Sequence, residues 1–342
     1  MTLPHSFAEP SLSMQATPPD RPASMVRAET SWMQGDVASA IQQGVTALGQ
    51  IESSCPADEL REAFLSVALY CREFGLYKSS LGLALKGFDS AVLARDSRAM
   101  TQALVLIGVG FTEIGRADAG HLVLLKALSR AEASRRVLDI LRVHNGLLLA
   151  AVAIREARAA EPLTPPQTEI LRLAVESARI VDEMSQPGSA SSGFVRAALL
   201  TNAGKVMCSS GNFDKGLTDL RQAQSIAMDG GYRLLHLKAL IGELHVLHQR
   251  SMALPLERLL NAISMARELK LSRLERSSLS LAMRVSDIDE ALRRDFAQRI
   301  HELDARQGEE EAERLVNPYA THVDKILAAA DPAALAHSHF SI

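Results

Sequence analysis

Glycine recurs in this chain at a fixed interval of forty residues. Gly35, Gly75 and Gly115 are each followed by one small residue five positions later and by another twelve positions later. These small residues are Ala40 and Ala47, Ser80 and Gly87, and Gly120 and Ala127. Self-similarity at such a period indicates stacked supersecondary units that cannot bury their apolar faces alone. The interval therefore argues against most compact folds and predicts a repeat array.

Further copies of the unit follow downstream. Gly211 is followed by Gly216, Leu220 and Ala223 in the same register. A divergent unit runs between these copies through residues 141–180, where a proline-rich break at 162–166 replaces the short turn. Residues 240–269 and 278–303 have the pattern of two more degenerate helix pairs.

These units resemble the tetratricopeptide repeat family, which carries a small residue at position 8 of helix A, glycine in the turn, and small residues at positions 20 and 27. With Gly115 at position 15, the units place Leu104, Ile107, Gly108 and Phe111, and likewise Leu200, Ala203, Gly204 and Met207, at positions 4, 7, 8 and 11. The resemblance covers residues 22–305. It implies an all-α fold, a right-handed α-solenoid of about seven antiparallel helix pairs.

The unit length and the last residues of the array extend this resemblance. Forty residues exceed the 34 of the standard unit, and the chain is similar to the long arrays attached to bacterial diguanylate cyclases. Those arrays end in a charged helix that leads to the catalytic domain, and residues 296–315 are similar to it. No G-G-[DE]-E-F sequence follows in this chain.

The run 104–120 raises an alternative, because Gly108, Gly110 and Gly115 lie there among apolar residues. A phosphate-binding loop needs a strand before the glycines and a helix that begins at the last one. Neither the context nor the spacing is present, and Glu113 stands where an anion would have to bind. We therefore predict that Gly108 allows two helices to pack closely.

Composition supports helices packed through small and aliphatic side chains. Aromatic residues make up 4% of the chain and hydrophobic residues 47%, which does not suit a β-sandwich. Lys and Arg number 37 against 40 Asp and Glu, for a net charge of −3, so neither nucleic acid nor a membrane is expected as a partner. The separated cysteines Cys55, Cys71 and Cys208 predict no disulfide framework and favour a cytoplasmic location.

The two ends of the chain differ from the array. Residues 1–21 lack the apolar core of a secretory signal and are predicted to be a disordered leader. Residues 306–342 are predicted to form a charged terminal helix and a tail. Within them, 323–340 has enough apolar residues for a short helix that either caps the last pair or docks on another molecule. No run approaches the roughly 18 uncharged apolar residues that span a membrane.

The resemblance also implies a binding groove, because stacked units expose one concave face made mostly of helix A side chains. Its register predicts that a peptide or protein binds along a mixed aliphatic and polar surface. The predicted groove residues are Trp32, Leu69, Arg72, Glu73, Thr112, Glu113, Asn145, Thr201, Asn202 and Lys205.

Some of these residues have a structural alternative. Trp32 either anchors a partner or staples the first helix pair at the exposed end of the array, and we favour the staple because terminal units need extra burial. Asn145 and Asn202 lie near the position where some family members bind a peptide backbone or terminal carboxylate. Only Lys205 of the required cations is near, so an interhelical hydrogen bond is the favoured role.

Neither a metal nor a catalytic centre is predicted, and no cofactor is expected. His245 and His248 lie three residues apart, nine and twelve residues after His236, but no further ligand completes a site with certainty. No G-x-S-x-G or H-E-x-x-H motif occurs. We therefore predict a non-enzymatic scaffold or adaptor for a protein or peptide in bacterial signalling, with a homodimer left open. The alternative is a sensory module acting in trans on a diguanylate cyclase-type enzyme or a transcription factor.

Overall fold

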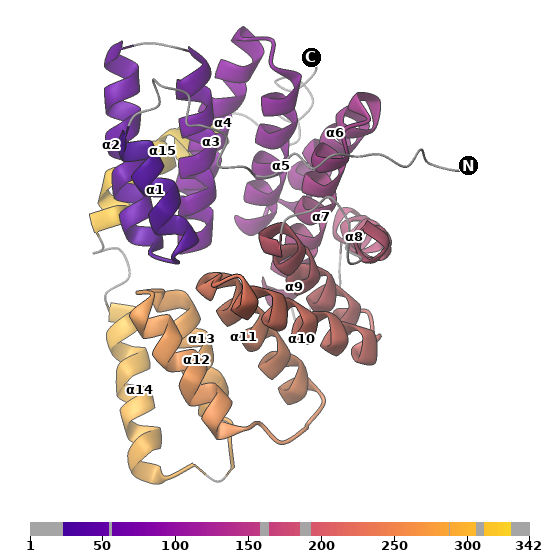
Figure 1. Cartoon of the computed structure of the whole chain (residues 1–342), viewed down its shortest axis with the longest axis vertical. Helices are drawn as coiled ribbons and strands as arrows, with labels where there is room; N and C mark the ends of the chain where they lie inside the picture. Colours follow the sequence, from indigo (N-terminus) through magenta and orange to yellow (C-terminus); the bar gives the residue numbers. More distant parts are fainter. Residues whose placement is uncertain are drawn as a thin grey trace.

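The computed structural model describes residues 23–54, 57–157, 164–184, 193–286, 288–305 and 311–329. These residues form fifteen α-helices and no strand, which confirms the all-α prediction (Figure 1). The helices are α1 (Ala23–Met33), α2 (Val37–Ser54), α3 (Ala57–Phe74), α4 (Tyr77–Leu93), α5 (Ser97–Glu113), α6 (Ala117–Ser134), α7 (Val137–Ala157), α8 (Pro165–Met184), α9 (Gly193–Ser209), α10 (Phe213–Asp229), α11 (Arg233–Gln249), α12 (Leu256–Glu268), α13 (Ser272–Ala282), α14 (Glu290–Ala305) and α15 (Glu311–Ala329). The predicted leader at 1–21 lies outside the described residues.

The first fourteen helices pack as seven consecutive antiparallel pairs, so the predicted α-solenoid is confirmed. Glycines mark the bend in four of the pairs. Gly35, Gly75, Gly115 and Gly211 have φ values of 87°, 98°, 83° and 90°, in the left-handed region that glycine enters without steric cost. At each of them, two successive amides donate back to carbonyls of the last helical turn, which is the Schellman ending.

Gly108 packs where the two helices of the third pair meet, as predicted. A Cβ atom at Gly108 would lie 2.7 Å from Cγ of Leu124 and 3.1 Å from the carbonyl oxygen of Gly120. At Gly204 a Cβ atom would lie 2.8 Å from the carbonyl oxygen of Gly216. The helices approach this closely only because these side chains are absent. Gly108 is also within α5, away from any helix N-terminus that would bind phosphate.

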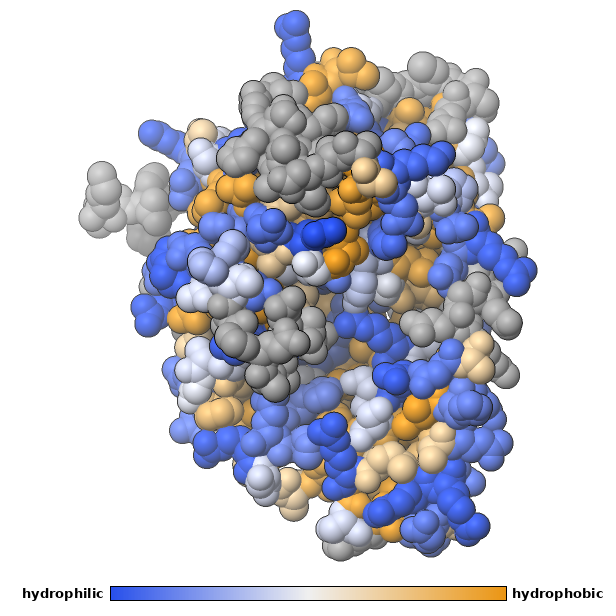
Figure 2. All heavy atoms as spheres, turned by 180° about the vertical axis from the view of Figure 1, so that it is seen from behind, coloured by the Kyte–Doolittle hydropathy of each residue, from blue (hydrophilic) through white to orange (hydrophobic). Residues whose placement is uncertain are grey.

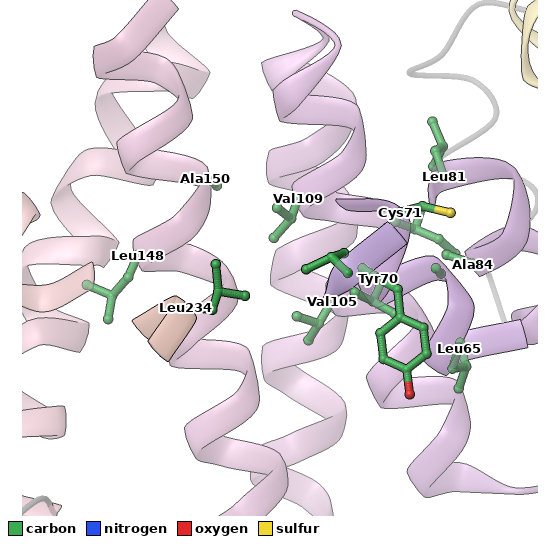
Figure 3. Packing of buried hydrophobic residues seen from close by; sticks show 14 of the residues in the cluster. Leu65, Tyr70, Cys71, Leu81, Ala84, Val105, Val109, Leu148, Ala150 and Leu234 are labelled. Carbon is green, nitrogen blue, oxygen red and sulfur yellow. The ribbon is translucent and has the colours of Figure 1, made fainter. Parts of the chain in front are cut away.

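The first helices of the pairs, from α3 to α13, contact one another in sequence and form an inner layer. Most of their buried apolar residues belong to one core cluster that extends from α1 to α15, and smaller clusters lie between α9, α10 and α11. Figure 3 shows Val105 and Val109 of α5, Leu148 of α7 and Leu234 of α11 within this cluster. Side chains of the inner helices therefore fill much of the space that a wide superhelix would leave open.

Helix α7 has the length and mean hydropathy of a membrane-spanning helix, although no such helix was predicted from the sequence. Over Val137–Arg155 it is long and apolar enough to cross a membrane by length and composition, the one such helix among the described residues. It is 56% buried by its neighbours, and Asp139 within it is buried and accepts from Arg142 at 3.0 Å. A mostly buried helix with an internal ion pair has the character of a core helix.

The last helix returns to the beginning of the array. After α14, α15 packs against α2 and α4 (Figure 1). Val316 and Val323 are fully buried there, and the ring of Tyr319 meets that of Phe64 edge to face at 6.5 Å. Gly82 of α4 provides the space, because a Cβ atom there would lie 2.4 Å from the carbonyl oxygen of Tyr319. The terminal helix therefore covers the second pair and does not cap the last one.

Candidate binding site

Two carboxylates lie at equivalent places in neighbouring units. Glu73 and Glu113 each come two residues before a turn glycine, so the forty-residue repeat places them at the same end of adjacent inner helices, α3 and α5. Arg72 lies between them. Its Nη1 donates to Glu73 Oε1 and its Nη2 pairs with Glu113 Oε1, both at 2.9 Å. All three side chains are at least nine-tenths buried.

The far end of the array completes this cluster. Nζ of Lys238 on α11 donates to Glu73 Oε2, and Arg273 of α13 stacks over the ring of Tyr77 with its guanidinium carbon 5.3 Å from the ring centre. These residues surround a cavity of about 50 Å³, which has room for a few water molecules. Buried Nε of Arg72 and Oε2 of Glu113 have no hydrogen-bond partner among the described residues. We call Arg72, Glu73, Glu113, Lys238 and Arg273 the inner charge cluster.

The inner charge cluster gives its two carboxyl groups opposite pKa shifts. Burial opposes ionisation of Glu73, but Lys238 and Arg72 outweigh it and lower the pKa of this carboxyl. Burial raises the pKa of Glu113, and its single bond to Arg72 does not compensate. Burial also opposes the charge of Arg72, yet Glu113 and Glu73 together raise its pKa. Glu73 is thus the carboxylate that joins the two ends of the array.

Trp32 makes a second contact between distant units. Its indole lies 5.7 Å from the ring of Tyr70 on α3 and 5.0 Å, edge to face, from the ring of Phe194 on α9. Phe194 in turn meets Tyr232 at 5.3 Å. Through these rings Trp32 contacts the second and fifth pairs, whereas the favoured staple was within the first pair. Its buried Nε1 has no partner among the described residues.

The predicted asparagines meet across the inner layer. Nδ2 of Asn202 on α9 donates to Oδ1 of Asn145 on α7 at 2.9 Å, which is the interhelical hydrogen bond that we favoured. Both are half-buried, as are Leu69 and Lys205. The aliphatic part of Lys205 lies beside Gly242 of α11. These four residues retain exposed surface on the inner helices.

Thr112 and Thr201 do not line a groove in this structure. They are 6% and 2% exposed, and their hydroxyls donate to carbonyl oxygens one turn earlier in their own helices, at Gly108 and Ala197. The prediction from register fails here because adjacent helices pack more closely than the repeat pattern alone indicates. Thr112, for example, faces the seam at Gly120, where an added Cβ atom would lie 2.3 Å from its hydroxyl.

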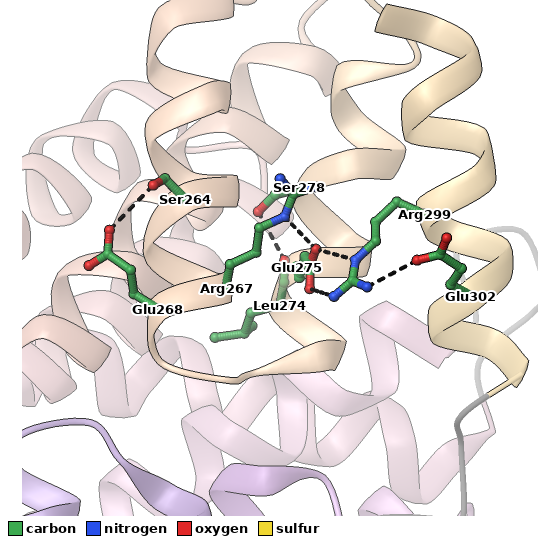
Figure 4. A network of polar contacts seen from close by, with 8 residues as sticks. All are labelled: Ser264, Arg267, Glu268, Leu274, Glu275, Ser278, Arg299 and Glu302. Carbon is green, nitrogen blue, oxygen red and sulfur yellow. Dashed lines mark hydrogen bonds and ion pairs between the residues drawn. The ribbon is translucent and has the colours of Figure 1, made fainter.

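Two further buried carboxylates hold the second half of the array together. Glu243 of α11 is fully buried and accepts from Arg258 at 2.6 Å, Gln224 at 2.7 Å and Arg221 at 2.9 Å. Burial opposes its charge, but these hydrogen bonds lower its pKa to about 2. Glu275 of α13 is bound in the same way by Arg267 and Arg299 (Figure 4). Each network joins three successive helices.

The histidines have separate partners. Nε2 of His245 lies 3.0 Å from Oγ of Ser277, and Nε2 of His248 lies 2.7 Å from Nη1 of Arg284. No group of three or more possible ligands among the described residues is placed to hold a metal ion. His144 Nδ1 lies 2.8 Å from Ser177 Oγ, but both side chains are buried between α7 and α8, and burial lowers the pKa of His144. This pair is inaccessible to a substrate.

Sequence reasoning missed Lys238 and Arg273. Their units lack the small-residue pattern that aligned the others, so register gave no position for α11 and α13. Both residues also precede the helix pairs predicted at 240–269 and 278–303, because α11 and α13 begin earlier, at Arg233 and Ser272. Of the ten predicted residues, the structure brings Arg72, Glu73 and Glu113 into one cluster and pairs Asn145 with Asn202.

The fold is a tetratricopeptide-like helical repeat array. No protein-family model matches the chain, and no curated protein sequence matches it significantly. A Rap protein complexed with competence and sporulation factor has a TM-score of 0.58 at 16% identity, over 90% of this chain and 75% of that chain. The Rap conjugation gene regulator of the plasmid pLS20, in complex with a Phr peptide, has a TM-score of 0.61 at 12% identity, over 84% and 75%.

A third similar structure is a signal-transduction ATPase of the STAND class with a tetratricopeptide repeat sensor, from Pyrococcus horikoshii. Its TM-score is 0.52 at 11% identity, over 93% of this chain and 47% of that one. At these identities the likeness shows a shared fold alone. The resemblance to tetratricopeptide repeats is thus confirmed for the fold.

Proposed function

We propose that this chain is a non-enzymatic adaptor that binds a peptide or an extended protein segment on the inner face of its solenoid. The observation that carries the proposal is the inner charge cluster, where buried Nε of Arg72 and Oε2 of Glu113 border a cavity without a partner among the described residues. A buried donor and acceptor left unpaired cost free energy that a bound polar ligand recovers. Asn145, Asn202 and Lys205 extend a polar surface along the neighbouring helices.

The cavity in the inner charge cluster is too small for a peptide, so binding requires the inner face to open. About 50 Å³ does not admit a peptide, since pockets for drug-sized ligands occupy about 300–1,000 Å³. A peptide therefore has to separate the contacts of Lys238 and Trp32 with their partners before it reaches the inner face. Binding would then be coupled to a change in the relative position of the two halves of the array.

This coupling favours a regulatory role as the second candidate. The ligand would change the shape of the array, and the array would act in trans on another protein, such as a diguanylate cyclase-type enzyme or a transcription factor. The two Rap structures, one in complex with competence and sporulation factor and one with a Phr peptide, support ligand binding by this fold. A role in bacterial signalling and a cytoplasmic location are part of the proposal. A homodimer is left open, and we expect neither nucleic acid nor a membrane as partner.

The proposal is tested with peptides selected from a random display library on the immobilised full chain. Affinity of each selected peptide is then measured for the wild type and for the Lys205→Glu variant on the inner face. Lys325→Glu, on the exposed side of α15, is the matched control with the same change in charge. We expect a loss of about tenfold or more for Lys205→Glu alone. Equal affinity for all three proteins, or no selected peptide, would contradict binding on the inner face.

A further inference from the structure

Two turns on one edge of the solenoid carry arginine where glycine is usual. The turns that follow α4 and α6 contain Arg95 and Arg135, which have φ values of 55° and 54° and lie forty residues apart. Glycine is the residue that most often occupies this left-handed position after a helix. Glycine occupies this conformation at Gly75, Gly115 and Gly231, and among the other described residues Ser251 and Lys270 adopt it as well. Both turns therefore place a long, charged side chain at a position where the backbone favours glycine.

The two turns form one continuous surface. Nη2 of Arg130 on α6 lies 3.4 Å from Oγ of Ser97 at the start of α5, so the helix ends are in contact. The charge of Arg98 reaches Arg142 on α7. We call Leu93, Arg95, Arg98, Arg135, Arg136, Val137 and Leu138 the arginine edge. All of them are exposed.

The positive charge of the arginine edge is not neutralised by the residues that the structure describes. Arg95, Arg98, Arg135 and Arg136 make no side-chain hydrogen bond or ion pair with the described residues, whereas many other arginines of the chain are paired. Of the nearby acids, Asp96 caps α5 and pairs with Arg61, and Asp139 is buried against Arg142. Glu132 is the remaining exposed carboxylate within these two turns.

Apolar side chains lie between the arginines. Leu93 is 86% exposed, Val137 45% and Leu138 37%. A cluster of unpaired arginines around exposed aliphatic groups has the composition of a protein interface, where arginine is enriched and apolar groups form the centre. Guanidinium groups also match carboxylates through paired hydrogen bonds.

We propose that the arginine edge binds an acidic protein segment that presents carboxylates around an aliphatic anchor. Charge complementarity favours such a partner, because the two turns present four unpaired arginines and one exposed carboxylate. Nucleic acid does not need the exposed leucines and valine, and the patch has no aromatic residue on which a base would stack. An anionic membrane is disfavoured because the whole chain has a net charge of −3. This surface lies on the edge of the array and is distinct from the inner face.

The test uses a fluorescein-labelled amphipathic peptide of about 18 residues, or five helical turns, with Glu on one face and Leu on the other. Anisotropy titrations compare the full-length wild type with a variant carrying Arg95→Gln, Arg98→Gln, Arg135→Gln and Arg136→Gln. The control carries Arg27→Gln, Arg116→Gln, Arg155→Gln and Arg314→Gln, which removes the same charge from exposed arginines elsewhere. We expect the arginine-edge variant to bind about tenfold more weakly and the control to bind as the wild type does.

A second variant separates binding from folding. Arg95→Gly with Arg135→Gly restores the residue that the left-handed turns favour, so it should unfold at the same or a higher temperature and still bind the peptide more weakly. Equal weakening by the control variant would overturn the proposal. The same holds if a peptide with Gln in place of Glu binds as well, or if phosphatidylserine vesicles or duplex DNA bind this edge more tightly than the acidic peptide.

Discussion

Single residues determine how closely the helices of this array approach. Gly108 has Leu124 and the backbone of Gly120 against it, whereas Gly49 in α2 has no atom within 4 Å of an added Cβ. Glycine therefore has a different structural role in each of these two helices. In the first it is required by packing, and in the second it only weakens the helix.

Substitution separates these two roles. Gly108→Leu overpacks the seam between α5 and α6 and should reduce the free energy of unfolding by about 1–3 kcal/mol. Gly49→Ala is the control and should raise it by about 0.5–1 kcal/mol because alanine favours the helix. Chemical denaturation measures both. An unchanged midpoint for Gly108→Leu would remove the packing account of this glycine.

The two glutamates of the inner charge cluster should respond differently to neutralisation. Glu73→Gln removes the carboxylate that half-buried Lys238 and buried Arg72 share, and it should cost on the order of 3 kcal/mol. Glu113→Gln should cost less than about 1 kcal/mol, since burial already raises the pKa of this carboxyl and Arg72 keeps Glu73. Urea denaturation at neutral pH compares them. A larger loss for Glu113→Gln would show that Glu73 is not the principal link.

Glu243 should make stability depend on pH in the acidic range. Its pKa is lowered to about 2 in the folded protein, below that of an unfolded glutamate near 4.3. A depressed carboxyl pKa contributes stability that is present above the unfolded value and lost as pH falls toward the folded one. The free energy of unfolding of the wild type should therefore fall more steeply between pH 4.5 and about 2 than that of Glu243→Gln. Parallel curves would show that the buried network does not depend on this charge.

At the scale of elements, the position of α15 depends on a residue in a distant helix. The backbone carbonyl of Tyr319 occupies the space above Gly82, and Lys86 lies 5.8 Å from the ring of Tyr319. Exposed Lys78 and Asp324 add an ion pair that contributes little. The packing of α15 against α4 therefore depends mainly on shape complementarity.

Filling the space above Gly82 should release α15. Gly82→Val places side-chain atoms where the backbone of Tyr319 lies, so α15 must shift or detach while α4 remains folded. Hydrogen–deuterium exchange of residues 311–329 should rise in this variant with little change in α5 and α6. Gly49→Val, at an exposed and open position, is the control. Unchanged protection of α15 would mean that other contacts hold it.

The elements themselves were largely predictable, whereas their long-range contacts were not. Gly35, Gly75 and Gly115 located the bends because a left-handed residue after a helix has a strong sequence signature. Gly82 has no such signature, since its partner Tyr319 is distant in sequence and belongs to no repeat. Likewise, Glu73 and Glu113 were found from the register, but Lys238 was not, because its contact depends on the curvature accumulated over several units.

At the scale of the whole molecule, the two ends of the array meet across the inner face. Lys238 reaches Glu73, and Trp32 reaches Phe194. A linear stack of repeats gains stability only from neighbouring units, so these contacts add a cooperative link between units far apart in the chain. The same link restricts access to the inner face.

Trp32 reports on this closure, because it is the one tryptophan in the chain. Lys238→Ala removes the ion pair with Glu73 and should loosen the two halves, so that the indole becomes more hydrated and its emission shifts to longer wavelength. Lys325→Ala, at an exposed residue of α15, is the control and should leave the spectrum unchanged. Identical emission in all three proteins would indicate that the ion pair does not hold the ends together.

The most direct test of the proposed function is hydrogen–deuterium exchange of the full chain with and without a selected peptide. Binding on the inner face predicts slower exchange in α5, α7, α9 and α11, together with altered exchange around Trp32 and Lys238 as the two halves move. Slower exchange confined to the outer helices α6, α8 and α10, or no change in any inner helix, would contradict the account.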